Sequence, residues 1–345
     1  MKLVSYKTPA HKQRVGLLCD GQVFDLQAGG DACSVTLPST MREFLRQGER
    51  GMQTARFVQR AASEGKLKAV PGKHLSLLSP VPEPTSCRDA YAFRSHVAAA
   101  RRNRGLQMIA EFDQFPVFYF TNHLAVFGEG DITVESDHLQ ELDFELECAA
   151  VIGKPGKNIP AAQAGSHIAG FMIMNDFSAR RLQMEEMKLS LGPAKGKDFA
   201  TAFGPWLVTP DELQPYRIDG ANGVTFDLRM TARHNGRLIS DGNLKEMTWT
   251  FAEIIDRCSY GVDLHAGDVI GSGTVGTGCY LELNGTRAAQ ARTKGEAFQP
   301  VWLQAGDTIE LEITGLGLLR NRIVKAPRDY SILARKKTSP AQTQV

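Results

Sequence analysis

The chain has 345 residues, 42% of them hydrophobic and 23% charged, which is typical of a globular protein. Lys and Arg number 40 against 38 Asp and Glu, so the net charge is only +2 and no basic excess points to a nucleic-acid or polybasic membrane partner. No apolar run approaches the ~20 residues of a membrane helix. The sequence does not open on an apolar leader, and its six cysteines lack C-x-x-C spacing. We therefore expect a cytoplasmic protein with reduced thiols.

The N-terminal quarter is expected to form a small α+β domain. Strand-like runs occupy residues 2–6, 14–18 and 22–26. The Asp20-Gly21 pair between the last two runs predicts a hairpin turn. Apolar side chains recur at helical spacing over residues 38–64. Three prolines interrupt residues 77–87, which places a domain boundary there and assigns residues 1–78 to the small domain.

Strand patterns dominate the remainder, residues 79–331. The expected strands are 116–120, 142–153, 167–179, 225–239, 268–273, 279–283 and 307–317. The expected helices are 94–110, 181–190 and 250–258. His234-Asn235-Gly236-Arg237 predicts a second hairpin turn, and the polar residues 332–345 predict a disordered tail. The fold class is therefore a β-rich α+β protein.

An acidic pattern marks residues 142–148. Side chains of a strand alternate between its faces, so Asp143, Glu145 and Glu147 would share one face of an otherwise apolar strand. Burying such like charges without a partner would cost several kcal/mol. Either water solvates this face or a cation binds it, and the segment alone leaves both readings open.

Other acidic residues favour the cation. Asp176 ends the apolar run 172–174, and Asp89 lies seven residues before His96 at the start of an expected helix. Several carboxylates and one histidine, without cysteine–histidine spacing, suit a hard cation such as Mg²⁺, Mn²⁺ or Ca²⁺ rather than Zn²⁺.

Over roughly residues 80 to 330 the sequence resembles the fumarylacetoacetate hydrolase family. The matching motifs, in the family's order, are D-x-Y-x-x-x-x-H (Asp89, Tyr91, His96), L-D-x-E-L-E (Glu145, Glu147), M-N-D-x-S-A-R-x-x-Q (Asp176, Arg180, Gln183), G-K-x-F (Lys197), S-G-T (Thr274) and L-E-L (Glu282). The resemblance implies a mixed β-sandwich or roll of the family's C-terminal domain type for residues 79–331, commonly assembled as a homodimer.

The resemblance also implies roles for these residues. The metal ligands would be Asp89, Glu145, Glu147 and Asp176. His96 would be the general base, oriented by Glu282. Charge on the substrate would be stabilised by Arg180, Gln183 and Lys197, and Tyr91, Tyr119 and Thr274 would contact it. One arginine of Arg101, Arg102 and Arg104 would reach the site from the lid.

The implied function is metal-dependent hydrolysis of a C–C bond in a fumarylacetoacetate-like or acylpyruvate-like diketo acid, as in aromatic catabolism. Two differences from smaller members favour hydrolysis: His96 comes five residues after Tyr91 rather than three, and Thr121 stands where those members carry Lys. The alternatives are a 2-oxo-acid hydratase, isomerase or decarboxylase of the family, or a catalytically silent metal-binding homologue. The G-x-G-x-x-G run at 271–276 is not expected to bind a nucleotide, because a strand rather than a helix is expected after it.

Overall fold

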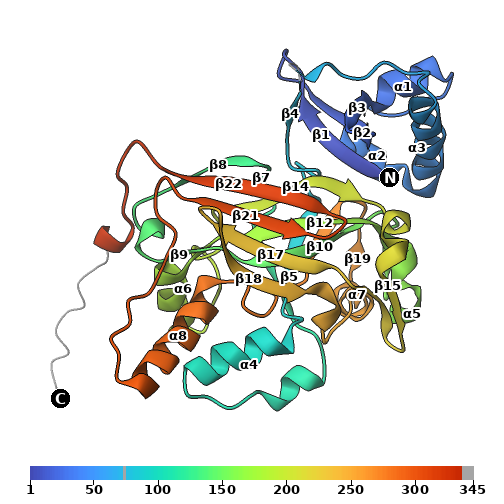
Figure 1. Cartoon of the computed structure of the whole chain (residues 1–345). Helices are drawn as coiled ribbons and strands as arrows, with labels where there is room; N and C mark the ends of the chain where they lie inside the picture. Colours follow the sequence, from blue (N-terminus) through green and yellow to red (C-terminus); the bar gives the residue numbers. More distant parts are fainter. Residues whose placement is uncertain (73–74, 336–345) are drawn as a thin grey trace.

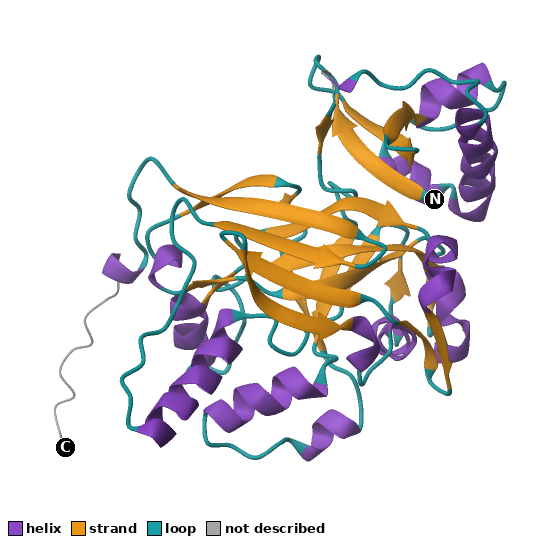
Figure 2. Ribbon diagram, viewed as in Figure 1, coloured by secondary structure: helices purple, strands orange, loops and turns teal. Residues whose placement is uncertain are grey.

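The computed structural model describes residues 1–72 and 75–335, and two large sheets form its centre (Figures 1 and 2). The path of the larger sheet is β3 (Gln22–Asp25), β2 (Gln13–Cys19), β1 (Lys2–Lys7), β14 (Thr201–Val208), β12 (Ile168–Asp176), β10 (Leu146–Ile152), β20 (Asp268–Gly271), β5 (Ser86–Ala90) and β6 (Phe118–Thr121). Two short strands join it beside this path: β4 (Ser76–Leu77) pairs with β1, and β7 (Val126–Phe127) pairs with β14.

The smaller sheet packs against the larger one. Its order is β18 (Arg237–Asn243), β17 (Arg229–His234), β21 (Thr308–Ile313), β22 (Gly317–Lys325) and β8 (Gly130–Val134). Phe171 and Ile173 from the larger sheet share one buried apolar cluster with Leu311 and Ile323 from the smaller sheet. Both sheets mix antiparallel with parallel pairs, such as β20 with β5 and β22 with β8. The predicted β-rich α+β fold with a mixed β-sandwich is confirmed.

Short strand pairs and helices surround these sheets. The pairs are β9 (Leu142–Asp143) with β13 (Ser178–Ala179), β11 (Gly156–Lys157) with β19 (Asp263–Leu264), and β15 (Arg217–Gly220) with β16 (Gly223–Phe226). The α-helices are α1 (Leu26–Ala32), α2 (Met41–Arg46), α3 (Gly48–Ser63), α4 (Arg94–Asn103), α5 (Ala161–Ala164), α6 (Arg180–Met187), α7 (Phe251–Ser259) and α8 (Tyr280–Lys294). Within the described residues, no helix combines the length and apolar character needed to cross a membrane.

The N-terminal region follows its sequence pattern with one difference. The β2–β3 hairpin turns at Asp20 and Gly21, both with positive φ, as the Asp-Gly pair predicts. The expected helix over 38–64 is divided into α2 and α3, because Gly48 takes a left-handed φ of 57° between them. Strand β1 pairs with β14, so this region extends the larger sheet. The division into domains 1–78 and 79–331 stays a prediction.

Several expectations for the rest of the chain are wrong in detail. Residues 279–283 open helix α8 instead of forming a strand, and the helix expected over 94–110 ends at Asn103. The expected strand 225–239 is divided among β16, β17 and β18, with the predicted hairpin turn at Asn235-Gly236. All six cysteines are free thiols. Of the expected tail 332–345, residues 333–335 form a 3₁₀ turn and 336–345 lie outside the described residues.

Candidate active site

Three buried carboxylates meet near the β6 end of the larger sheet. Asp89 lies on β5, Glu147 on β10, and Glu145 in the short break between β9 and β10. Each offers one oxygen, and these oxygens lie within 4.8 Å of one another. Asp89 lies within strand β5 rather than at the start of a helix, because helix α4 begins only at Arg94. The structure therefore brings together three of the four predicted metal ligands.

Gly271 makes this approach possible. Strand β20 separates β5 from β10, and its Gly271 is in register with Asp89 on one side and Ala149 on the other. A Cβ atom on Gly271 would lie 2.5 Å from Asp89 Oδ1 and 3.0 Å from Glu147 Oε2. Any larger residue would fill the space in which the two carboxylates converge.

The glycine run 271–276 also has a different role from the one its letters suggest. The N–H of Gly273 donates to Asp89 Oδ1 and to Glu147 Oε2, both at 3.1 Å. Thr274 Oγ1 lies 3.5 Å from Glu147 Oε1. A helix, α8, follows this run, so the strand expected there is wrong. The run still does not suit a nucleotide, because the Gly273 amide faces carboxylates rather than a phosphate.

Asp176 lies beside this group at the end of β12. Its Oδ2 accepts hydrogen bonds from the Tyr119 hydroxyl at 2.5 Å and from Lys197 Nζ at 2.8 Å. Lys197 also contacts Glu145, so the ammonium bridges the two acids. Asp176 Oδ1 is buried and has no hydrogen-bond partner among the residues that the structure describes. One carboxylate oxygen therefore remains available beside the three-carboxylate group.

Asp143 shares Arg180 with Glu145 but is not one of the three converging carboxylates, so the expectation of one shared acidic strand face is wrong. The strand is interrupted at residues 144–145, where the Glu145 N–H donates to the Asn175 side-chain oxygen instead of to a backbone carbonyl of a neighbouring strand. Asp143 accepts the backbone N–H groups of Tyr280 and Leu281, at 2.7 and 2.9 Å, and thereby caps the start of α8. This carboxylate is a structural group.

Arg180 and Gln183, predicted to stabilise charge on the substrate, contact protein groups. Arg180 donates to Asp143 at 2.9 Å and to Glu145 at 2.6 Å, and its third contact is the Gln183 amide oxygen at 2.9 Å. The buried guanidinium is therefore a counter-ion of two carboxylates. A direct contact of Arg180, Gln183 or Lys197 with substrate stays a prediction.

Burial dominates the electrostatics of the acidic group. It raises the pKa of Asp89 to about 7, with Asp176 adding to the shift, and raises the pKa of Glu147 well above its usual range. At Glu145 burial acts in the same direction, but the Lys197 and Arg180 charges overcome it and lower the pKa to about 2. Ionising all the carboxylates without a further cation is therefore costly.

These residues fit a divalent cation. Asp89, Glu145, Glu147 and Asp176 carry four potential charges, while the cations in contact are Lys197 and Arg180, the latter shared with Asp143. At least two negative charges remain uncompensated, and one buried Asp176 oxygen lacks a partner. An all-oxygen donor set suits Mg²⁺, Mn²⁺ or Ca²⁺. The structure supports a metal site and leaves the ion's identity to experiment.

His96 and Glu282 form a buried pair between two helices that lie side by side, α4 and α8 (Figure 1). His96 Nδ1 and Glu282 Oε2 are 2.6 Å apart, and the other Glu282 oxygen accepts the Thr277 N–H at 3.0 Å. A carboxylate at Nδ1 leaves Nε2 as the nitrogen that can exchange a proton. Glu282 lies in the first turn of helix α8, and its side chain faces the histidine.

Tyr91 lies between the His96–Glu282 pair and Phe112. Its ring packs edge-on against His96, with centroids 5.8 Å apart, and against Phe112 at 6.4 Å. Burial raises the pKa of Tyr91, and the Arg104 charge partly offsets this shift. The charge of Arg104, one of the three arginines predicted near the substrate, therefore acts on a predicted substrate-binding residue.

Three contributors were missed from the sequence: Asn175, which positions Glu145, Asp143 as a helix cap, and Gly271 as a spacer. Their partners are distant in sequence, so no local spacing reports them. The Asn-Asp pair after an apolar strand was the one available signal for Asn175.

Comparison with known proteins identifies the family. The domain described as fumarylacetoacetate (FAA) hydrolase C-terminal matches residues 85–324. The chain belongs to the fumarylacetoacetate hydrolase family. That match covers the carboxylate group, the His96–Glu282 pair and both large sheets apart from the N-terminal strands.

The family's curated relatives extend the match to nearly the whole chain. A mitochondrial oxaloacetate tautomerase of Bos taurus is 31% identical over 328 residues, covering 94% of this chain and 92% of the relative. An oxaloacetate tautomerase of Bacillus subtilis (strain 168) is 28% identical over 324 residues, covering 90% of this chain and 95% of the relative.

Solved structures of the family share the fold. A fumarylacetoacetate hydrolase from Exiguobacterium antarcticum has a TM-score of 0.64 at 24% identity, with 94% of this chain and 100% of that chain covered. A 5-carboxymethyl-2-hydroxymuconate delta-isomerase from Mycobacterium smegmatis has a TM-score of 0.62 at 21% identity, with 95% and 100% covered. Proteins that share this fold are thus named as hydrolases and isomerases, and the curated relatives are named as tautomerases.

Proposed function

We propose that this protein is a divalent-metal-dependent tautomerase of a small 2-oxo acid, with oxaloacetate as the first candidate substrate. The observation that carries the proposal is the buried His96–Glu282 pair next to the acidic group, where the histidine is near enough to help lower the pKa of Glu145. The whole-length similarity to oxaloacetate tautomerases supports this choice of reaction.

The proposed base is His96. Its Nε2 takes a proton from the carbon next to the 2-oxo group and returns a proton to the oxygen, which converts the keto form to the enol. Glu282 holds the histidine in one tautomer and stabilises the imidazolium between these two transfers. The reaction consumes no water, which suits a pair of side chains that are each only 6% exposed.

The neighbouring groups prepare the site for this transfer. Asp89, Glu145, Glu147 and Asp176 would hold the metal, which when bound polarises the oxygens of a 2-oxo acid and so acidifies the adjacent C–H bond. Despite burial, the Asp176 and Glu145 charges raise the pKa of Lys197, so it acts as a fixed ammonium rather than as a base. Burial and the neighbouring acids raise the pKa of Tyr119 well above its usual range, so its phenol stays protonated and donates to Asp176.

Hydrolysis of a C–C bond in a diketo acid is the second candidate. The same histidine would take a proton from water instead of carbon, and the spacing of His96 from Tyr91 and the absence of a lysine at Thr121 favour this reaction. Hydration, other isomerisations, decarboxylation and a silent metal-binding role follow as further alternatives. The homodimer stays a prediction. The cytoplasmic location also stays a prediction, since the Bos taurus relative is named as mitochondrial.

A substrate panel separates these reactions. The Mg²⁺-loaded protein is incubated with oxaloacetate, fumarylpyruvate, fumarylacetoacetate and simple acylpyruvates, while UV absorbance follows the enol and chromatography identifies products. Tautomerisation accelerates loss of enol-oxaloacetate without breaking carbon bonds, hydrolysis yields two acid fragments, and decarboxylation releases CO₂. Cleavage of a diketo acid with no acceleration of oxaloacetate tautomerisation would replace the first candidate by the second.

A matched pair of histidine variants tests the base. His96→Ala should lower the rate by ~10²–10⁴-fold while metal binding is retained. His265→Ala, at an exposed histidine between β19 and β20, should leave the rate unchanged. Near wild-type turnover by His96→Ala would remove His96 from the mechanism.

A further inference from the structure

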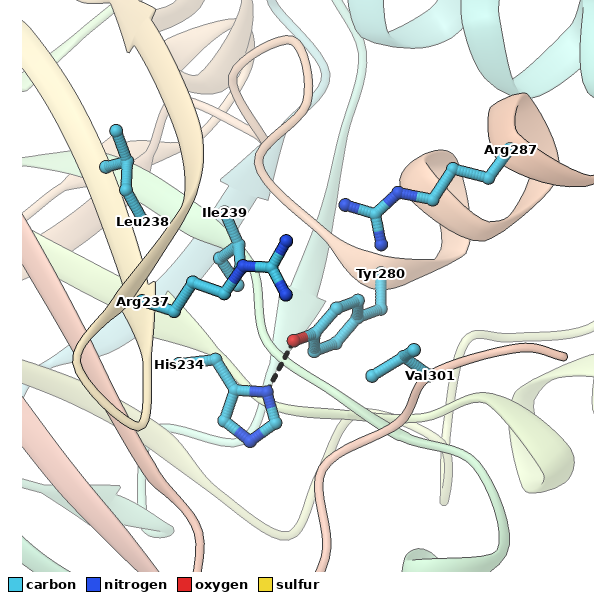
Figure 3. Close-up of a pocket in the computed structure, with 7 residues that line it drawn as sticks. All are labelled: His234, Arg237, Leu238, Ile239, Tyr280, Arg287 and Val301. Carbon is cyan, nitrogen blue, oxygen red and sulfur yellow. Dashed lines mark hydrogen bonds between the residues drawn. The ribbon is translucent and has the colours of Figure 1, made fainter. Parts of the chain in front are cut away.

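A second cavity, of about 320 Å³, lies between the β17–β18 hairpin and the start of helix α8 (Figure 3). The hairpin contributes His234 and Arg237, and the helix contributes Tyr280 and Arg287. Its size is at the lower end of the range of small-molecule sites. None of these four residues belongs to the acidic group or to the His96–Glu282 pair.

Two guanidinium groups enter this cavity without partners. Figure 3 shows Arg237 and Arg287 extending toward one another from opposite walls, above the Tyr280 ring. Within the described chain, neither guanidinium group makes an ion pair or a hydrogen bond. Both charges act on the Tyr280 phenol, where they partly offset the burial and the Asp143 and Asp307 charges that raise its pKa to about 12. Two unpaired like charges directed into one space favour an anion there.

Three other arginines of the same sheet are neutralised. Arg229 pairs with Asp241 at 2.7 Å, Arg320 with Glu310 at 2.6 Å, and Arg322 with Asp131 at 2.7 Å. The sheet therefore supplies carboxylates to these arginines, whereas the two at the cavity face each other. A planar guanidinium is well suited to bind a carboxylate with two hydrogen bonds.

The polar floor of the cavity is fixed by hydrogen bonds. His234 Nδ1 and the buried Tyr280 hydroxyl are 2.5 Å apart, and His234 Nε2 lies 2.9 Å from Asp307. When Nε2 donates a hydrogen bond to Asp307, Nδ1 accepts a hydrogen bond from the Tyr280 hydroxyl. The phenol oxygen then keeps a lone pair with which it can accept a further hydrogen bond. The Asp143 side chain already occupies the amides at the start of α8, so any anion would depend on side chains rather than on the helix end.

The remaining wall is apolar. Leu238, Ile239 and Val301 line it, and Val301 is held in place by two hydrogen bonds with Asn284, at 2.9 and 3.0 Å. An aliphatic surface beside two cations favours an organic acid over an inorganic anion, because the carbon skeleton can cover that surface.

We propose that this cavity binds the carboxylate of a small organic acid between the guanidinium groups of Arg237 and Arg287. The site is distinct from the proposed catalytic site, and it does not depend on which reaction that site performs.

Methyl NMR with malonate as the probe tests the proposal. Isoleucine methyl groups are labelled in the full Mg²⁺-loaded chain, and the Ile239 resonance, assigned with an Ile239→Val variant, reports this cavity. Ile109, which lies near Tyr91, reports binding at the candidate active site. Malonate should move the Ile239 resonance saturably, at constant ionic strength.

Charge-removing variants locate the binding. Arg237→Gln and Arg287→Gln should each weaken the Ile239 response by about tenfold or more, the effect of losing a charge-assisted contact. Arg233→Gln is the matched control, because Arg233 is an exposed arginine of the same hairpin that does not line the cavity. An Ile239 shift that is equal in wild type and in the double variant, which combines Arg237→Gln with Arg287→Gln, would overturn the proposal.

Three further outcomes would also overturn it. If inorganic phosphate moves the Ile239 resonance where malonate does not, the ligand is an inorganic anion. Light scattering could instead show that the double variant loses a subunit while malonate leaves Ile239 unmoved, which would make the cavity part of an interface between copies. A response to malonate at Ile109 alone would place all binding at the candidate active site.

Discussion

Two regions of the molecule contain the same trio of groups: a carboxylate between a tyrosine hydroxyl and a cation. In the N-terminal region, Asp25 Oδ2 accepts the Tyr6 hydroxyl at 2.6 Å and Arg14 Nε at 2.7 Å. Its other oxygen accepts the Ala28 N–H at 2.8 Å and so caps helix α1. Every oxygen of this carboxylate has a partner.

At the candidate active site, Asp176 Oδ2 has the corresponding partners, Tyr119 and Lys197, but Oδ1 has none. The pKa values differ accordingly. Burial opposes ionisation at both acids, but at Asp25 the hydrogen bonds from Arg14 and Ala28 prevail and hold its pKa below the usual value. At Asp176 burial prevails and raises the pKa. A completed trio stabilises the fold, whereas an incomplete one is suited to a ligand.

The largest expected contrast is in metal binding. Asp176→Asn should weaken Mg²⁺ or Mn²⁺ binding by about 100-fold or more, since it removes a proposed ligand. Its metal-free unfolding free energy should change by less than about 1 kcal/mol, because burial and the Glu145 charge disfavour the ionised Asp176 and offset the lost contact with Lys197. Calorimetric titration and urea unfolding measure the two quantities. Unchanged metal stoichiometry and affinity would show that Asp176 is not a ligand.

The reverse pattern is expected for Asp25→Asn. Loss of the helix cap and of the charged contact with Arg14 should lower the unfolding free energy by ~1–3 kcal/mol. Metal affinity should match that of wild type. If urea unfolding gave equal stabilities for the two proteins, the Asp25 trio would not be the stabilising one.

The Asp25 contribution should also depend on pH. The folded-state pKa is below the usual Asp value of ~3.9, so the stabilisation is present above that pH and is lost as the pH falls through the folded-state pKa. Unfolding curves of wild type and Asp25→Asn should therefore differ near neutral pH and converge in acid. A gap of constant size down to the lowest pH at which both proteins fold would contradict this assignment.

The smallest effects are expected for the two tyrosines. Tyr6→Phe should lower the unfolding free energy by about 1 kcal/mol, the usual net value of one hydrogen bond, without affecting metal binding. Tyr119→Phe should instead change metal affinity, because Asp176 Oδ2 loses a competing donor. Equal effects of both variants on stability and on metal binding would remove the distinction between the trios.

The sequence predicts the acidic group well because motif and geometry agree there. Asp89, Glu145 and Glu147 converge as expected, although strand alternation fails between Asp143 and Glu145. In that break the Phe144 N–H donates to the Asp143 side chain and the Glu145 N–H to the Asn175 side chain. Side-chain acceptors that replace strand partners leave no periodic signal in the sequence.

Helix α8 illustrates why the rest could not be predicted. The letters Cys-Tyr-Leu-Glu-Leu alternate as in a strand, and no local capping residue indicates a helix start. The cap is Asp143, which lies 137 residues earlier than Tyr280. The cavity beside Tyr280 was missed for the same reason, since its two arginines come from elements brought together only by the fold.

The pairing of β1 with β14 has a consequence for how the chain reaches its native state. Lys2 pairs with Val208, so β1 meets this partner only after the long stretch of chain between them has been made. Contacts of such long range slow folding, because a large loop must close before they form. Until then β1 can pair with β2 and β4 while the edge meant for β14 remains open. Nascent chains that stall before residue 208 would expose this edge to other strands, which makes aggregation during synthesis the expected failure of this architecture.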